Sequence, residues 1–143
     1  MEQYQDGITG FERFLEIMDA EPEKDGESAK DIGKVSGHIR FENVSYSYGT
    51  GENVLNNVSM DIPTGETFAL VGPSGGGKTT ICHLIPHFYD VTQGKIFIDD
   101  TEIHDITLDS LRKNIGIVQQ DIYLFNASIK ENILCGRLDA TDQ

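Results

Sequence analysis

The stretch that decides the fold is residues 72–79, which read Gly72-Pro73-Ser74-Gly75-Gly76-Gly77-Lys78-Thr79. It fits the pattern G-x-x-x-x-G-K-[ST], in which a glycine-rich loop joins a strand to a helix. A continuous apolar run, residues 67–71, precedes the loop, and residues 79–87 read as a helix that ends around Pro86. Such a run is expected of a strand covered on both faces of a parallel sheet. The sequence therefore predicts a strand, a phosphate-binding loop and a helix, in that order.

The residue types of this loop suit a triphosphate. Glycine adopts positive φ and places no Cβ in front of a ligand, so successive N–H groups form an anion-binding nest. In this pattern Lys78 bridges the β- and γ-phosphates and the Thr79 hydroxyl ligates Mg²⁺. The alternative is a glycine-rich turn that merely joins strand to helix. We predict that ATP and Mg²⁺ are bound by Gly72, Pro73, Ser74, Gly75, Gly76, Gly77, Lys78, Thr79 and Thr80.

Segments on both sides of the loop predict further elements. Alternating apolar residues predict strands over residues 38–44 and 54–62, and shorter strands are predicted over 95–99 and 115–118. Residues 108–114 read as a short helix that Thr107 is placed to cap. Residues 128–135 read as another helix, with Ser128 at its N-cap and Glu131 three residues on.

The first part of the chain differs from the rest in charge and pattern. Apolar residues recur at helical spacing within residues 1–20, and residues 21–37 read as an acidic linker rich in turn residues. We therefore expect an ordered domain over residues 38–143. The net charge is −13, from 24 acidic and 11 basic residues. A chain this acidic would repel nucleic acid, and it has no apolar run long enough to insert into a membrane.

The sequence segments on both sides of the loop resemble those of the nucleotide-binding domain of an ABC transporter of the exporter type. The resemblance rests on residues 41–48, 55–59, 65–72, 85–90, 94–99, 115–121 and 128–133, and it covers essentially the whole chain. It implies an α/β fold, a partial P-loop NTPase with an antiparallel β subdomain, preceded by a helix and an acidic linker. The helix resembles the segment that joins such a domain to its last membrane helix.

The resemblance also implies a function and further site residues. Tyr48 stands where the family stacks an aromatic ring on adenine, although it also suits a strand tyrosine packed on the sheet. Gln120 matches the glutamine that touches Mg²⁺ and the attacking water, with Gln119 as the competing candidate. Lys78 and Gln120 are thus the predicted catalytic residues. The intact protein is expected to hydrolyse ATP and drive export, at the cytoplasmic face of the cell membrane, with a transmembrane domain and a second nucleotide-binding domain as partners.

Several family features do not occur before Gln143: the signature loop, the second acidic strand, the catalytic glutamate and the switch histidine. We therefore expect this chain by itself to bind nucleotide weakly at best and to turn over ATP negligibly. Asp100 stands where the family usually has glycine, so that turn must tolerate a side chain. Two other functions remain open at this stage, a nucleotide-responsive interaction module without chemistry and a soluble P-loop ATPase.

Other reactive residues have ordinary interpretations. His83 and His87 lie four residues apart on one predicted helix, but Pro86 disturbs that turn and no third metal ligand is evident. His38 and His104 read as surface or strand-edge residues. The acidic residues Asp99, Asp100, Asp105 and Asp109 are expected to cap turns. Cys82 and Cys135 are expected to be reduced thiols.

Overall fold

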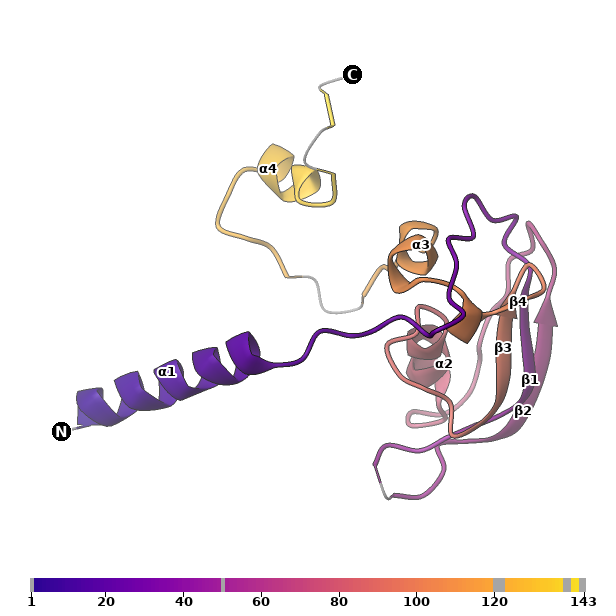
Figure 1. Cartoon of the computed structure of the whole chain (residues 1–143), viewed down its shortest axis with the longest axis horizontal. Coiled ribbons are helices and arrows are strands. Elements are labelled where there is room, and N and C mark those ends of the chain that lie inside the picture. Colours follow the sequence, from indigo (N-terminus) through magenta and orange to yellow (C-terminus); the bar gives the residue numbers. More distant parts are fainter. Residues whose placement is uncertain (1, 50, 120–122, 138–139, 142–143) are drawn as a thin grey trace.

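A computed structural model gives the fold of residues 2–49, 51–119, 123–137 and 140–141 (Figure 1). Its centre is a four-stranded antiparallel sheet in the order β2-β1-β3-β4. The strands are β1 (Ile39–Tyr46), β2 (Leu55–Ile62), β3 (Gln93–Ile98) and β4 (Thr101–Glu102). The helices are α1 (Glu2–Asp19), α2 (Lys78–Leu84), α3 (Leu108–Lys113) and α4 (Ile129–Leu134), with a 3-10 turn η1 (Ile103–Asp105). The strands predicted over residues 38–44, 54–62 and 95–99 are confirmed.

Strand β1 is the middle of the sheet and sets its register. Phe41 lies opposite Met60 of β2 and opposite Ile96 of β3. Because side chains alternate across a strand, Phe41 and Ile96 face the same side and are both about 1% exposed. The register of β1 with β3 shifts between Glu42 and Ser45, which marks a bulge.

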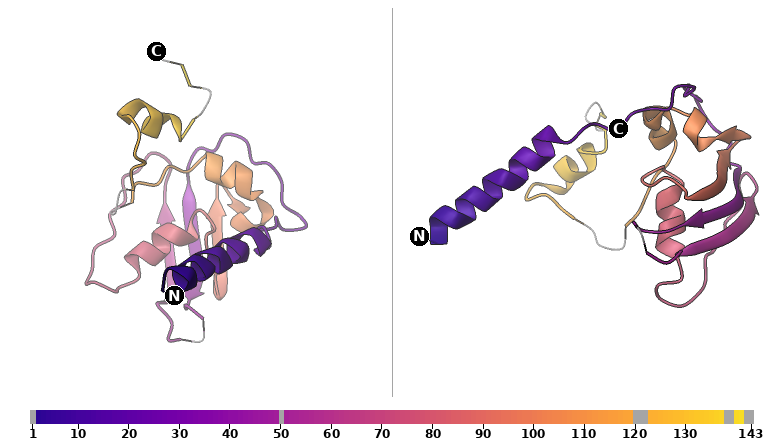
Figure 2. Two further views of the ribbon diagram at one scale, coloured as in Figure 1. Left: turned by 90° about the vertical axis from the view of Figure 1, so that its left-hand side faces the viewer. Right: turned by 60° about the horizontal axis from the view of Figure 1, so that its bottom comes forward.

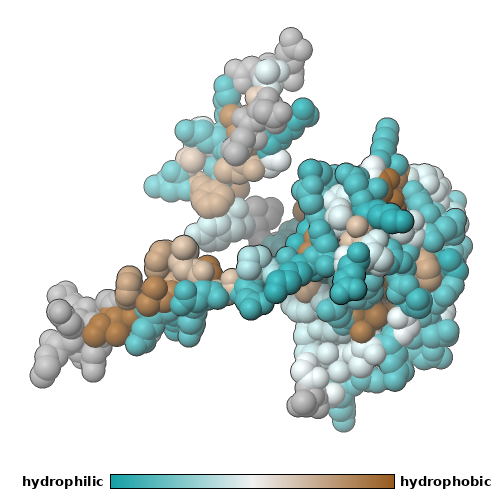
Figure 3. Space-filling model, in the orientation of Figure 1, coloured by the Kyte–Doolittle hydropathy of each residue, from teal (hydrophilic) through white to brown (hydrophobic). Residues whose placement is uncertain are grey.

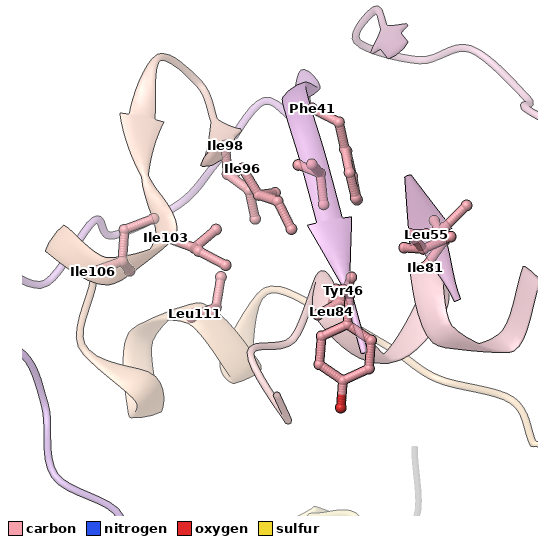
Figure 4. Close-up of a cluster of buried hydrophobic side chains, with 11 residues drawn as sticks. Phe41, Tyr46, Leu55, Ile81, Leu84, Ile96, Ile98, Ile103, Ile106 and Leu111 are labelled. Carbon is pink, nitrogen blue, oxygen red and sulfur yellow. The ribbon is translucent and has the colours of Figure 1, made fainter. Parts of the chain in front are cut away.

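The hydrophobic core lies between this sheet and the helices α2 and α3 (Figure 4). Helix α2 contributes Ile81 and Leu84, and α3 contributes Leu111, which meet the apolar face of the strands. The core consists of Phe41, Val44, Tyr46, Leu55, Ile81, Leu84, Ile96, Ile98, Ile103, Ile106 and Leu111.

The turn between β3 and β4 accommodates two aspartates in the left-handed region. Asp99 has φ 49° and Asp100 has φ 66°, as a two-residue hairpin of type I′ requires. The expectation that the side chain of Asp100 is tolerated at this turn is therefore confirmed. The Asp99 carboxylate accepts backbone N–H bonds from Ser36, Gly37 and His38 at 2.5, 3.1 and 2.9 Å.

These hydrogen bonds dominate the acidity of Asp99. Partial burial raises the pKa of its carboxyl, but the N–H groups of Ser36, His38 and Gly37 and the Ser36 hydroxyl outweigh burial and lower the pKa below its usual value. A lowered pKa stabilises the fold above the unfolded-state pKa of about 3.9. That stabilisation is lost as the pH falls through the folded-state pKa.

Asp99→Asn is therefore expected to lower the free energy of unfolding at pH 7 by about 1.5–3 kcal/mol, the range for hydrogen bonds to a charged group. Asparagine has the same shape and tolerates positive φ, so the change removes the charge and replaces one of the two acceptor oxygens by an NH₂ group. Urea unfolding at pH 7 and at pH 3 measures the effect. The difference from the wild type should shrink at pH 3, and an equal difference at both pH values would contradict this assignment.

The segment expected to be a solvated linker is bonded to the domain from Glu23 onward, where the Glu23 carboxylate pairs with Arg112 of α3. The Asp25 carboxylate accepts the N–H of Leu108 at 2.7 Å, so it caps α3 where the Thr107 side chain does not. Asp31 accepts the hydroxyl of the buried Ser110 at 2.9 Å. Backbone pairing of Lys30 with Ile106 continues this contact. The ordered domain thus begins earlier than His38, because side chains of the acidic segment satisfy polar groups of α3.

Helices α1 and α4 lie away from the sheet (Figures 1 and 2). An apolar stripe runs along α1 (Figure 3), and Phe11, Ile17 and Met18 are 61%, 75% and 65% exposed. Helix α1 begins at Glu2, and α4 begins with the predicted Ser128–Glu131 capping box. In the part of the chain that the structure describes, no helix is both long enough and apolar enough to cross a membrane.

The strands predicted over residues 67–71 and 115–118 are wrong for this structure. Both segments run on without pairing to any strand among the described residues. A strand needs a hydrogen-bonded neighbour, and an apolar run predicts burial without supplying that neighbour. Val71 is 93% exposed and Val118 is 95% exposed, whereas Leu70 and Ile115 pack against the core.

Candidate functional site

The glycine-rich loop is held at its end by the core of the sheet. Gly75 and Gly77 have φ of 79° and 78°, and Gly77 is the residue that precedes α2. A Cβ on Gly77 would lie 2.6 Å from the Leu55 side chain and 3.2 Å from the Val54 carbonyl oxygen. Glycine is therefore required there for two reasons, its backbone conformation and its close approach to β2. Residues 72–76 are exposed, so a ligand can reach their backbone.

Lys78 lies over this loop. Its Nζ donates to the carbonyl oxygens of Gly72 and Pro73 at 2.9 and 2.6 Å. Among the described residues it forms no ion pair with a carboxylate, so its charge is balanced only by carbonyl dipoles. An ammonium in this position attracts an anion, because carbonyl oxygens are weaker partners than phosphate oxygens.

The first turn of α2 places two hydroxyls behind the lysine. Thr79 is exposed, whereas Thr80 is 4% exposed. The Thr80 hydroxyl is within 3.1 Å of the Tyr48 hydroxyl, so Thr80 packs under the loop and does not face solvent. Thr79 is thus the threonine of the pair that an incoming metal ion can reach, as the motif predicts.

Tyr48 belongs to a group of three tyrosines beside α2. Its ring meets Tyr46 edge to face at 4.9 Å and Tyr89 edge to face at 5.5 Å. Tyr46 is buried, and that burial, reinforced by the neighbouring Tyr48 and Tyr89 hydroxyls, raises the pKa of its phenol. Tyr48 itself is 47% exposed. Its edge contacts fix the ring while part of it stays open to solvent, which fits a stacking platform for a base.

Tyr89 was not among the predicted site residues. It lies in the loop after α2 and contacts both Tyr46 and Tyr48. The sequence does show an aromatic residue, Tyr89, a few positions after the predicted binding helix. It does not show which tyrosines Tyr89 would contact. Gln120, the other predicted catalytic residue, lies outside the described residues. Gln119, its competitor, is exposed.

The exposed loop thus fits a phosphate chain. It offers glycines with positive φ, an ammonium that donates to two loop carbonyls and an accessible hydroxyl at Thr79. These are the donors that a magnesium-bound triphosphate needs on its phosphate side. The residues that would complete a hydrolytic site are not assembled by the described part of the chain.

A family model described as "ABC transporter" matches residues 55–143. The chain is 46% identical over 144 residues to the ABC transporter ATP-binding protein YwjA of Bacillus subtilis, covering 100% of this chain and 25% of that protein. It is 43% identical over 140 residues to an ATP-dependent lipid A-core flippase of Desulfotalea psychrophila, covering 97% and 24%. It is 56% identical over 107 residues to the mitochondrial iron-sulfur clusters transporter ATM1 of Candida albicans, covering 75% and 14%.

A solved structure also resembles this fold. It is described as a bacterial Atm1-family ABC exporter with ATP bound, and it superposes with a TM-score of 0.81 at 35% sequence identity. The superposition covers 96% of this chain and 24% of the exporter. The chain thus spans about a quarter or less of the length of these relatives.

Proposed function

This chain belongs to the ABC transporter family, and on that premise we propose that its glycine-rich loop binds ATP together with Mg²⁺. Lys78 would hold the terminal phosphates, the Thr79 hydroxyl would ligate Mg²⁺, and Tyr48 would stack on the adenine. In the whole protein, this binding would support ATP hydrolysis that drives export across a membrane. A transmembrane domain and a second nucleotide-binding domain would be its partners, at the cytoplasmic face of the membrane.

One observation carries the proposal. The Lys78 ammonium lies over an exposed loop, and among the described residues it donates hydrogen bonds only to carbonyl oxygens of that loop. Lys78 forms no ion pair with a carboxylate among the described residues. The lysine instead lies beside glycines whose backbone can turn N–H groups toward one anion. This arrangement is suited to a phosphate chain.

Titration of the folded chain with MgATP in a calorimeter tests the proposal. We expect saturable binding of MgATP. ADP should compete with it, whereas adenosine alone should compete weakly, because most of the contacts are to phosphates. Absence of saturable heat at millimolar MgATP, from material that unfolds cooperatively, would refute the proposal for this chain. Lys78 and Gln120 stay the proposed catalytic residues, to be measured as ATPase activity in the whole transporter.

Substitution of Tyr48 separates its ring from its hydroxyl. Tyr48→Ala is expected to weaken MgATP binding about fivefold, since stacking on a base contributes about 1–3 kcal/mol and the half-exposed ring is placed at the low end. Tyr48→Phe keeps the ring and loses only the hydrogen bond to Thr80, so its affinity should stay within about twofold of the wild type. Calorimetry measures the affinity of each variant and of the wild type, once for MgATP and once for magnesium triphosphate, which has no base. Equal losses with both ligands would exclude contact between Tyr48 and the base.

A further inference from the structure

Two histidines far apart in the sequence converge on one aspartate, at a distance from the glycine-rich loop. His87 and Asp90 lie in the loop after α2, and His104 lies in η1. The His87 Nε2 is 2.6 Å from the Asp90 Oδ1, and the His104 Nε2 is 3.8 Å from the same oxygen. One ligand atom from each of the three residues lies within 4.8 Å of the others.

These separations suit a tetrahedral ion. Zinc binds imidazole nitrogen and carboxylate oxygen at about 2.0–2.2 Å, so neighbouring ligand atoms of a tetrahedral site lie about 3.4 Å apart. The two distances to Asp90 lie on either side of that value. The two imidazole rings are nearly perpendicular, at 82°, with centroids 4.6 Å apart. Both rings can therefore point a nitrogen at one ion without stacking on each other.

The backbone around the three residues is firmly held. Arg112 of α3 donates from Nη2 to the His87 carbonyl at 3.0 Å and from Nε to the Pro86 carbonyl at 3.2 Å. On the other side, Ile103 begins η1 and Ile106 follows it, and they are 1% and 2% exposed. Since both segments are anchored, the backbone holds the three side chains of the cluster close together.

The cluster opens onto a cavity of about 400 Å³, which leaves room for water ligands. Glu23 and Leu108 line the same cavity. The Glu23 carboxylate is 2.5 Å from the Arg112 Nη1, and this hydrogen bond lowers the pKa of Glu23. Because Arg112 neutralises Glu23, this pair adds no net charge near the cluster, and Glu23 is not a ligand. Three protein ligands and an open position are the arrangement of an accessible zinc site.

We propose that His87, Asp90 and His104 bind a divalent transition-metal ion of the Zn²⁺ class and join the loop after α2 to η1. Two imidazoles and one carboxylate favour zinc over magnesium or calcium, which prefer oxygen ligands. The His87 Nδ1 is buried without a hydrogen-bond partner among the described residues. Metal-bound histidines usually donate this second nitrogen to an acceptor, so the expected affinity is micromolar, below that of a four-ligand structural site.

The chain offers a matched control. His38 and Asp61 form another exposed His–Asp pair, with Nε2 and Oδ1 2.7 Å apart. No third histidine, cysteine or carboxylate completes that pair in the part of the chain that the structure describes. Cys82 and Cys135 are free and exposed, and thiolates bind zinc, so both are first replaced by serine.

The test is calorimetric titration of the chain carrying Cys82→Ser and Cys135→Ser with ZnCl₂, without nucleotide. His104→Ala and Asp90→Asn are expected to weaken Zn²⁺ binding by at least about tenfold, because loss of even an outer-shell partner costs about 10–100-fold. His38→Ala should leave the affinity unchanged. Both changed residues are exposed or partly so, and a circular dichroism spectrum confirms that each variant is folded.

A second measurement uses no cluster variant. The imidazole proton signals of His87 and His104 should shift together as Zn²⁺ is added, while those of His38 and His83 stay in place and Mg²⁺ has no effect. The proposal is overturned if Zn²⁺ binds His104→Ala as tightly as the parent chain. It is also overturned if the folded parent chain binds Zn²⁺ more weakly than about 100 μM, which corresponds to roughly 5.5 kcal/mol.

Discussion

Lys78→Ala is expected to weaken MgATP binding by roughly ten- to a hundredfold. A hydrogen bond to a charged group contributes about 1.5–3 kcal/mol, and about 1.4 kcal/mol is a factor of ten in affinity. Within the described ranges of the chain, the ammonium bonds only to the carbonyl oxygens of Gly72 and Pro73. Removing it therefore leaves no buried charge behind, so the cost should appear in binding and not in folding.

Three measurements make this expectation specific. MgATP titration gives the affinity, and urea unfolding should show a free energy of unfolding within about 0.5 kcal/mol of the wild type, as for other surface changes. Lys113→Ala is the matched control, because Lys113 is an exposed lysine paired with Asp109 on α3. Equal MgATP affinity in Lys78→Ala and the wild type, with both folded, would remove Lys78 from the site.

Gly94→Ala is expected to destabilise the sheet by about 2–6 kcal/mol. Gly94 has φ 84° and lies across from the bulge in β1. A Cβ there would come closer than 3.0 Å to the carbonyl oxygens of Glu42 and Asn43. Positive φ in a residue with a side chain costs about 1–3 kcal/mol, and displacing backbone to relieve overpacking costs about 1–3 kcal/mol more.

Thermal and urea unfolding measure the effect of Gly94→Ala. Gly116→Ala is the control, because a Cβ on Gly116 meets no atom within 4 Å. The β1–β3 pairing should be the part that opens first, visible as faster amide exchange at Phe41 and Ile96, which lie opposite each other. A free energy of unfolding equal to that of the wild type would show that the bulge relaxes at little cost.

Local patterns predicted most of the antiparallel sheet and the glycine-rich loop. Alternation between residues 38 and 44 and the apolar positions of residues 54–62 each specify one buried face, and pairing those faces fixes β1 against β2. The capping box at Ser128 depends only on neighbouring residues, so it too was predicted. The comparisons confirm the family that the sequence segments on both sides of the loop indicated.

Features that depend on contacts between distant segments were not predicted. The run before Gly72 has the composition of a strand, yet strand geometry requires a partner that the described residues do not provide. Similarly, helical spacing pointed to His83 as the companion of His87. The break in the helix after Leu84 turns His87 toward η1 instead, where it meets His104. Gln120 stays a prediction from resemblance.

The capping of α3 by Asp25 gives α1 a short tether. Only residues 20–24 separate the end of α1 at Asp19 from this anchor. The six steps from Asp19 to Asp25 reach at most about 22 Å, and Glu23 within them also pairs with Arg112 of α3, so α1 cannot leave the vicinity of α3. Over so short a span, the effective concentration of α1 at the domain surface is in the millimolar range. Even a weak affinity of its apolar stripe for a neighbouring surface would then suffice to hold it there.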